Sequence, residues 1–524
     1  MAAQATLLSE IESINPATGE VIARFKATST RDIPGIMARA REAHAKWSQR
    51  PLEARCAHLG RLRDALYARR RELADLVTRE TGKPLVESLF ADVLVSIDAA
   101  AYYASRTPRL LRPERVPHHN LAVKAKTGRL DYEPFGVIGI ISPWNYPLAI
   151  PLGEMIPAVA AGNAVVWKPS ELTPCCGALV GELFAQAGFP LGLVEVIQGG
   201  SEAGAALIEA RPDKVIFTGS MVTGQLVGEA CARRLIPSVL ELGGKDAMIV
   251  LADADLETAS SAAVWGSFTN CGQACLSVER IYVERAIAER FAERCAAKTR
   301  ALKLGPGSDP DVEVGPMIRV SKVERVEEQL RDAVARGARI LVGGHRRLDL
   351  GPSYFEPTLV IDVDHSMRLM QEETFGPVLV LSRVEDAEEA VALTNDSPFG
   401  LSASIWTGDR QRGRELAARL KAGAVMVNDV ASYFGICEAP HGGRGASGWG
   451  RTHARLGLLE MVQVKYVDVD MLPRYPKAWW FGYDDKLATA ADHFIEFLFA
   501  PERRRRWARG WGTLRRLFFR GHRI

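Results

Sequence analysis

The stretch Gly136-Val137-Ile138-Gly139-Ile140-Ile141 decides the fold, because it has the form of a short, buried apolar strand. Two patterns then alternate along the chain. Helical spacing over 150–161, 176–187 and 202–210 separates further short apolar runs at 164–168, 194–198 and 214–217. Strands that alternate with helices of this length predict a parallel sheet with right-handed crossovers, which is a setting that suits a dinucleotide.

The second half of the chain repeats this alternation from 246–251 onward. Helical patterns cover 286–304 and 320–336, and strand patterns cover 340–343, 358–361 and 378–382. We therefore expect an α/β protein with two doubly wound, Rossmann-like domains that have parallel sheets. The first is expected from residues 1–120 and 135–243, and the second from residues 244–455.

Two further segments lie outside this alternation. Residues 121–130 alternate loosely, as in a two-stranded ribbon, and residues 461–470 alternate strictly, as in an edge strand that needs a partner. We assign 121–134 and 456–472 to a β arm. Residues 473–524 form a separate C-terminal tail.

The composition of the 524 residues, 47% hydrophobic and 25% charged, is ordinary for a globular protein. The tail has 12 Lys and Arg against 5 Asp and Glu, so the rest of the chain is net negative although the total is +3. Nucleic acid is therefore the weakest partner class. The first 14 residues lack the pattern of a signal peptide, and no run approaches the roughly 18 apolar residues of a membrane span.

The tail interleaves aromatic residues with arginines, as in Trp479-Trp480-Phe481 and Arg503-Arg504-Arg505-Arg506-Trp507. This composition is typical of a segment that lies on an anionic lipid surface. An alternative is that the tail packs on the body or on another subunit. We expect residues 479–524 to bind a membrane surface.

Cys275 lies on a short turn between an apolar run and the strand-like run at 280–283. A cysteine beside apolar residues is often an inert buried side chain. A thiol on a turn can instead meet a substrate, and its thiolate adds readily to an electrophilic carbonyl. Cys271 and Cys275 have no second pair and no His cluster nearby, so the spacing does not indicate a metal site. We expect covalent catalysis without a metal.

Two segments offer groups that such a nucleophile needs. Asn145, between Pro143 and Pro147 at the end of a strand, could stabilise an oxyanion, although an asparagine also suits a tight turn. Glu241 precedes Gly243-Gly244 and could be a mobile general base that activates water against a thioester. The alternative is that Glu241 caps a helix or pairs with Lys245.

The usual Gly-x-Gly-x-x-Gly fingerprint of a dinucleotide site does not occur at the strand-to-helix junctions of the first domain. Instead, Phe217-Thr218-Gly219-Ser220-Met221-Val222-Thr223-Gly224 follows a strand and opens a helix. Gly219 and Gly224 give the spacing Gly-x4-Gly, and the helix N-terminus at Gly219 and Ser220 could hold a pyrophosphate.

Lys168 and Glu171 also follow a strand and could bind the hydroxyls of the adenosine ribose. A 2′-phosphate beside Glu171 would be repelled, and Lys168 would offset part of that repulsion. We therefore expect NAD as the cofactor, with NADP as the alternative.

With these motifs the chain resembles the NAD(P)-dependent aldehyde dehydrogenase superfamily from Asn15 to about Asp470. The motifs that carry the resemblance occur in the family's order and spacing, at 143–147, 168–171, 217–224, 241–245, 272–275, 373–377 and 447–448. Two departures stand out. His441 replaces the usual Phe before Gly-Gly, and Asp246 replaces the usual Ser, Asn or Ala. Neither removes a catalytic group, but the aldehyde preference does not transfer.

The resemblance implies the roles of individual residues. Cys275 is the implied nucleophile, Asn145 with the backbone N–H of Cys275 is the implied oxyanion hole, and Glu241 is the implied base for the deacylating water. Implied cofactor contacts are Trp144, Lys168, Glu171, Gly219, Ser220, Glu373 and Phe375, the last two at the nicotinamide ribose and ring. The resemblance also implies a homodimer or homotetramer joined through the β arm.

We expect NAD-dependent oxidation of an apolar, medium- or long-chain aliphatic aldehyde to its acid through a thiohemiacetal and a thioester. A second interpretation is a semialdehyde dehydrogenase, for example for succinic semialdehyde, which needs a cation in the substrate tunnel. A third, from a different class, is a non-catalytic binding or structural protein on this scaffold, against which Cys275, Glu241 and Asn145 argue. A cytoplasmic location is expected, peripheral on the inner face of a membrane.

Overall fold

The computed structural model describes residues 10–475, 477 and 479–501. These residues form two compact units. The first contains the residues up to 111 and 133–463, and the second contains 112–132 and the residues from 464 onward.

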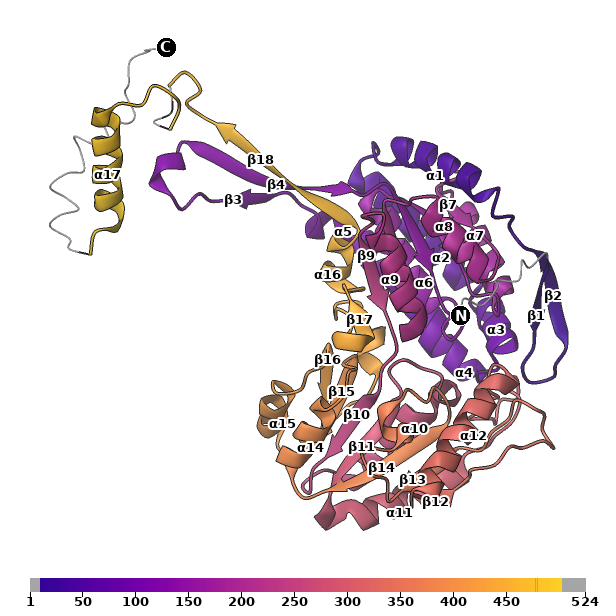
Figure 1. Cartoon of the computed structure of the whole chain (residues 1–524). Coiled ribbons are helices and arrows are strands. Elements are labelled where there is room, and N and C mark those ends of the chain that lie inside the picture. The colour runs from indigo at the N-terminus through magenta and orange to yellow at the C-terminus, as the bar shows by residue number, and fades with distance from the viewer. Residues whose placement is uncertain (1–9, 476, 478, 502–524) are drawn as a thin grey trace. The chain divides into compact units, whose positions relative to one another are not determined.

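The first unit contains the parallel sheet that the sequence predicts (Figure 1). Its strand order is β17-β9-β8-β5-β6-β7, parallel except at β17. The strands are β5 (Val137–Ile141), β6 (Ala164–Lys168), β7 (Val194–Val196), β8 (Lys214–Thr218), β9 (Ser238–Glu241) and β17 (Gly448–Trp449), and the crossover helices are α6 (Ala149–Ala161), α7 (Pro174–Gln186), α8 (Ser201–Glu209) and α9 (Met221–Ala232).

The strand order places a crevice where ligands bind in such folds. From β5 the chain continues to β6 and β7 on one side, and then to β8 and β9 on the other. The order of strands therefore reverses between β5 and β8, and the carboxyl ends of these strands border the crevice. Every residue of α6, which follows β5, is buried. Gly162 ends α6 with φ at +108°, a conformation that glycine adopts without strain.

A second mixed sheet in the same unit has the order β12-β13-β14-β11-β10-β15-β16 and is parallel except for β12. Its strands are β10 (Asp246–Val250), β11 (Val278–Glu284), β12 (Arg339–Val342), β13 (Thr358–Ile361), β14 (Val378–Val384), β15 (Ser402–Trp406) and β16 (Ala424–Val427). Helices and short helical turns accompany it at α10 (Leu256–Phe268), η3 (Thr269–Gly272), α11 (Arg285–Ala301), α12 (Val320–Ala335), α13 (Arg368–Gln371), α14 (Ala387–Asn395), α15 (Arg410–Ala417) and η4 (Ser432–Gly435). The chain then returns through η5 (Gly445–Ser447) to β17, and α16 (Ala454–Leu459) packs against α5 and α6. The predicted α/β fold with parallel sheets is confirmed.

The N-terminal part of the first unit is mostly helical. It comprises β1 (Glu10–Ile14), β2 (Val21–Lys26), α1 (Ile33–Trp47), α2 (Leu52–Ala68), α3 (Arg70–Thr81), α4 (Leu85–Glu87), η1 (Ser88–Leu94) and α5 (Val95–Leu110). Pro108 lies inside α5, within its last turn. Leu111 still donates its N–H to the carbonyl of Thr107, so the helix continues past the proline to its end at Leu110.

The second unit is a small sheet followed by a helix. The sheet has the order β18-β4-β3, from β3 (Glu114–Val116), β4 (Lys126–Pro134) and β18 (Val462–Asp470). The predicted ribbon at 121–130 is wrong at its start, because Leu121–Val123 forms a 3-10 turn, η2, capped by the side chain of Asn120. Helix α17 (Asp485–Phe499) follows.

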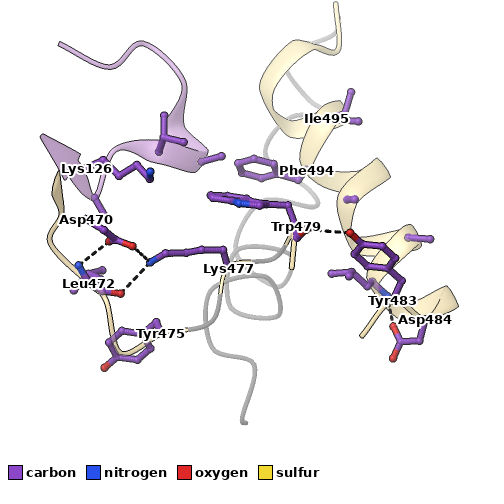
Figure 2. A pocket seen from close by; sticks show the side chains of 16 residues that line it. Lys126, Asp470, Leu472, Tyr475, Lys477, Trp479, Tyr483, Asp484, Phe494 and Ile495 are labelled. Atoms are coloured by element: carbon purple, nitrogen blue, oxygen red, sulfur yellow. Dashed lines mark hydrogen bonds and ion pairs between the residues drawn. The ribbon is translucent and has the colours of Figure 1, made fainter. Parts of the chain in front are cut away.

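An apolar pocket of about 720 Å³ lies within the second unit, between residues 122–126, the side chains of Asp470, Leu472, Tyr475, Lys477 and Trp479, and α17. Figure 2 shows Trp479 and Phe494 side by side in it, and Lys477 directed at Asp470 and Leu472. Among the described residues, no helix is long and apolar enough to cross a membrane. The arginine-rich segment 503–520 lies outside the described residues.

Candidate active site

A cleft of about 150 Å³ lies at the carboxyl ends of β5, β8 and β9. It brings together most of the predicted site residues: Trp144, Asn145, Gly219, Ser220, Glu241, Cys275, Glu373 and Phe375. Thr218, Lys322 and Arg325 also line it and were not predicted. Lys322 and Arg325 belong to α12, where their sequence context is that of an ordinary amphipathic helix, so no local signal marks them.

The turn that carries Cys275 is fixed by unusual backbone conformations. Asn270, Cys271 and Gly272 have φ values of 50°, 56° and 70°. A Cβ on Gly272 would lie 2.1 Å from the carbonyl oxygen of Gly376, so only glycine fits there. The side chain of Gln273 donates to the Asn270 carbonyl at 3.0 Å and accepts from the Ile318 N–H at 2.9 Å. These contacts hold the turn in one shape.

Asn145 is buried beside this turn. Its Nδ2 donates to the carbonyl of Gln273 at 3.0 Å, which orients the amide and leaves its second N–H to donate elsewhere. Its backbone carbonyl accepts from Lys83 Nζ at 2.7 Å and from Asn270 Nδ2 at 3.0 Å. Asn145 therefore belongs to a network of hydrogen bonds that fixes its position. A preference of asparagine for tight turns does not by itself account for these contacts.

The pair Lys83 and Asp92 supports Asn145 from behind. Their side chains are fully buried with Nζ and Oδ2 2.8 Å apart. Asp92 Oδ1 also accepts the N–H groups of Leu148 and Ala149 at 3.1 Å, so the pair ties the segment around Asn145 to the start of α6. Removing one partner of such a buried pair typically costs about 3–5 kcal/mol.

Glu241 ends β9 and is buried. Within the part of the chain that the structure describes, neither of its carboxylate oxygens has a hydrogen-bond partner. Lys245 Nζ instead donates to Glu279 at 2.6 Å and to Thr374 at 3.1 Å. The alternatives in which Glu241 caps a helix or pairs with Lys245 are therefore excluded. Burial, and next the charge of Glu154, raises the pKa of Glu241 well above its usual range.

The two glycines after Glu241 allow close approach, by the side chain of Glu373 to Gly243 and by the backbone of Cys275 to Gly244. A Cβ on Gly243 would lie 2.3 Å from Glu373 Oε1, and one on Gly244 would lie 2.6 Å from the carbonyl oxygen of Cys275. Burial, and next the carboxyl groups of Asp246, Glu373 and Glu241, raises the pKa of the Cys275 thiol. The protein groups around Cys275 therefore favour the protonated thiol.

The segment 373–375 forms the other wall of the cleft. Glu279 holds it by accepting the N–H groups of Thr374 at 2.8 Å and Phe375 at 2.9 Å. Phe375 has φ at +54° and meets the ring of Trp144 edge to face at 5.8 Å. Burial raises the pKa of Glu373 to about 7.

Lys168, Glu171 and Gly224 do not line this cleft. Lys168 and Glu171 are paired at 3.3 Å beyond the end of β6. A Cβ on Gly224 would lie 2.3 Å from Leu242, so Gly224 serves the packing of α9 against the strand end. Ser220 caps the N-terminus of α9 through the N–H of Thr223. This helix end, the aromatic pair of Trp144 and Phe375 and the polar Lys168–Glu171 pair suit a dinucleotide.

A funnel of about 340 Å³ reaches Cys275 from another side. It is lined by Phe90, Ala91, Val95, Tyr146, Ile150, Trp265, Thr269, Ala274, Cys275, Leu276, Ala431, Ser432, Phe434 and Gly435. Among these described residues there is no charged side chain. Lys83 lies 4.0 Å from the Tyr146 ring, but its ammonium group is buried and bound to Asp92. The thiol therefore connects an apolar funnel with a polar cleft.

An α/β fold of this topology, with a thiol between an apolar funnel and a dinucleotide-type cleft, defines an NAD(P)-dependent oxidoreductase. Residues 3–467 match the sequence model described as "Aldehyde dehydrogenase family". The chain belongs to the aldehyde dehydrogenase family.

Individual relatives agree with this family. The chain is 38% identical to a 4,4′-diapolycopene aldehyde oxidase from Methylomonas sp., over 94% of this chain and 92% of the other. It is 40% identical to a protein from Mycobacterium ulcerans (strain Agy99) named as a succinate-semialdehyde dehydrogenase [NADP(+)], over 85% and 86%.

Solved structures are also similar. One is an NAD-dependent aldehyde dehydrogenase from Sinorhizobium meliloti, with a TM-score of 0.86, 34% identity and coverage of 90% of this chain and 93% of the other. Another is an NAD⁺ complex of an aldehyde dehydrogenase from Bacillus cereus, with a TM-score of 0.84, 35% identity and coverage of 88% and 93%.

Proposed function

We propose that this enzyme oxidises apolar, medium- or long-chain aliphatic aldehydes to carboxylic acids, with NAD as its preferred cofactor. The uncharged, partly aromatic funnel that ends at Cys275 is the observation that carries the substrate class. Transfer of an alkyl chain from water to such a surface is favourable, by about 0.8 kcal/mol per buried CH₂. A carboxylate at the far end of a semialdehyde would meet no cation among the described lining residues.

In the proposed reaction the thiol of Cys275 first gives its proton to solvent, and Sγ then adds as the thiolate to the aldehyde carbon and forms a thiohemiacetal. The free N–H of Asn145 and the backbone N–H of Cys275 donate to the resulting oxyanion. The bound nicotinamide supplies the acceptor for the hydride, and the product on Cys275 is a thioester. Glu241 then takes a proton from water as that water attacks the thioester carbon, and the acid leaves.

Residues from three regions of the chain would hold the cofactor. Ser220 and the N-terminus of α9 suit the pyrophosphate, Lys168 and Glu171 suit the adenosine ribose, and Glu373 suits the second ribose. The Glu171 carboxylate supports NAD over NADP, because it would repel a 2′-phosphate.

The relatives point to two kinds of aldehyde, and the funnel favours one. The Methylomonas relative is named for 4,4′-diapolycopene aldehyde, and the Mycobacterium ulcerans relative for succinate semialdehyde. The semialdehyde is the second candidate, supported by that name and opposed by the lining of the funnel.

Initial rates of NADH formation with aldehydes of increasing length test the substrate class. We expect kcat/KM to rise from butanal to dodecanal by at least about tenfold and to be low for succinic semialdehyde. Phe90 lies at the funnel and is 66% exposed, so Phe90→Arg should lower kcat/KM for dodecanal by roughly tenfold without harming the fold. Leu191→Arg, at a fully exposed site away from the funnel, is the matched control and should change little. A preference of the wild type for succinic semialdehyde would contradict the proposal.

We also propose that the second unit binds a membrane surface peripherally. In support, Phe481 is 88% exposed. Trp479, Trp480 and Tyr483 are also exposed, at 48%, 49% and 64%. Aromatic rings of this kind favour the headgroup region of a bilayer. The proposed reaction does not itself depend on this binding to a membrane surface.

Co-sedimentation with phosphatidylglycerol vesicles tests this association. The triple substitution of Trp479, Trp480 and Phe481 by alanine should reduce the bound fraction at least about fivefold, because it removes the exposed aromatic groups. Alanine at Leu191 and Leu348, two exposed apolar residues of the first unit, is the control and should leave binding unchanged. Equal binding of the triple variant and the wild type would exclude these aromatics as the contact.

A further inference from the structure

A second, smaller cavity lies beside Glu241. Its volume of about 20 Å³ is enough for one water molecule. Cys275 and Glu241 line it, and its other polar side chains are those of Glu154, Thr218, His441, Thr452 and His453. A buried water needs two to four polar partners, and this lining offers them.

Glu154 is the only ionisable residue of α6, and α6 is buried along its whole length. Its Oε1 accepts from Thr218 Oγ1 at 2.8 Å. Its Oε2 is buried and has no hydrogen-bond partner in the described part of the chain. Isolated buried carboxylates are costly, so a position like this one calls for a functional or structural reason.

The two histidines that line the cavity, His441 and His453, are uncharged at neutral pH. Burial lowers the pKa of His441 to about 3 and that of His453 to about 4. His441 Nε2 lies 3.7 Å from Glu241 Oε2, and its Nδ1 lies 2.9 Å from the Tyr433 hydroxyl. Arg451 lowers the pKa of both Glu241 and His441 by its charge, whereas Glu154 and Glu460 raise that of Glu241. The ionisable carboxyl that shares the cavity with Glu241 is Glu154.

We propose that Glu154 accepts, through one water in this cavity, the proton that Glu241 takes up when the thioester is hydrolysed. This inference rests on the proposed function, because it assigns the fate of a proton in that reaction. The carboxylate with an unpartnered oxygen, the water-sized cavity and the open oxygens of Glu241 together carry it.

Hydrolysis of each thioester sets one proton free. The oxygen of the attacking water bonds to the thioester carbon, the C–S bond breaks, and sulfur leaves as the Cys275 thiolate. One proton of that water goes to Glu241. Glu241 then gives a proton to the cavity water, which gives one to Glu154, and Glu241 is a base again. Glu154 releases the proton to solvent before the next turnover. Thr218, whose hydroxyl donates to Glu154, also lines the cofactor cleft.

The pH dependence of this step has a defined sign. Burial raises the pKa of Glu154 to about 8, and Glu154 accepts a proton only when it is ionised. The kcat of the wild type should therefore rise with pH through about 8 whenever deacylation limits turnover. The two histidines titrate far below this range, so they do not produce this rise. Glu241 must also be ionised to act as a base, and the variants below separate its titration from that of Glu154.

Glu154→Gln tests the inference, because it keeps the size of the side chain and the bond to Thr218. We expect kcat at pH 9 to fall at least about tenfold, the rise near pH 8 to disappear, and NADH to form in a burst that precedes a slow steady state. Added imidazole or another small base should restore part of kcat. The rate of the burst, which reports formation of the thioester, should stay close to that of the wild type. The burst rate also distinguishes the titration of Glu154 from that of Cys275, because only the titration of Cys275 would change the burst.

Glu460→Gln is the matched control. Glu460 also raises the pKa of Glu241 by its charge, but it does not line the cavity and binds Lys214 instead. If Glu154 acts only by charge, Glu154→Gln will lower the pKa of Glu241, as Glu460→Gln does, and will increase kcat below pH 7. That result, or an unchanged kcat at pH 9, overturns the inference and leaves the proposed function intact. If the wild type forms no NADH with any aldehyde, the proposed function itself fails.

Discussion

Replacing Cys275 by alanine is expected to lower kcat for aldehyde oxidation by at least about 10⁴-fold, because the thiohemiacetal and the thioester both need Sγ. Cys275 lines both the apolar funnel and the polar cleft, so no other described thiol is placed to replace it. Binding of NAD, followed by protein fluorescence, should change little. Steady-state NADH formation at saturating dodecanal measures the loss.

Cys271→Ala is the control for this prediction. Cys271 is four residues away and buried in the core cluster around β10 and β11, so its loss removes packing but no reacting group. We expect a cost of about 1 kcal/mol in the free energy of unfolding and a change in kcat of less than about threefold. Retention of turnover by the Cys275 variant, or an equal loss in both variants, would refute covalent catalysis by Cys275.

Glu241→Gln is expected to lower kcat by about 10²- to 10⁴-fold and to leave thioester formation nearly intact. Glutamine fits the site because no described partner binds the carboxylate oxygens of Glu241. Without the base, hydrolysis should become the slow step, and each active site should release about one NADH in a burst before turnover slows. Rapid mixing of enzyme, NAD and aldehyde, with NADH followed by absorbance, measures burst and steady state together.

Glu438→Gln, at an exposed carboxylate, should leave both phases unchanged. If Glu241→Gln instead abolishes the burst, Glu241 acts before the thioester forms, and its proposed role in deacylation is wrong. The raised pKa of Glu241 also gives a sign for the pH dependence. Its carboxylate form is the active base, so hydrolysis should be fastest on the alkaline side.

Much of this protein could be predicted from local patterns. The strands at 137–141, 164–168 and 214–218 have buried, mainly β-branched residues, and helices of about a dozen residues separate them, so the parallel sheet follows. Cys275, Asn145 and Glu241 could be singled out because each lies in a short stretch whose turn residues are unusual. The structure brings these three residues to one cleft. The 3-10 turn at Leu121–Val123 was missed, because the cap from the Asn120 side chain outweighs the loose alternation of this segment.

The sequence by itself therefore determined the alternating α/β fold and the proposed reacting groups, since both depend on residues close together along the chain. Only the tertiary structure decided what surrounds those groups. Asp92 meets Lys83 and the start of α6, Thr218 meets Glu154 from another strand end, and Arg325 reaches the cleft from α12. The funnel likewise joins Phe90, Tyr146, Trp265 and Phe434, which are far apart in the chain. Such contacts depend on how distant elements pack together, and no pattern within one segment encodes them.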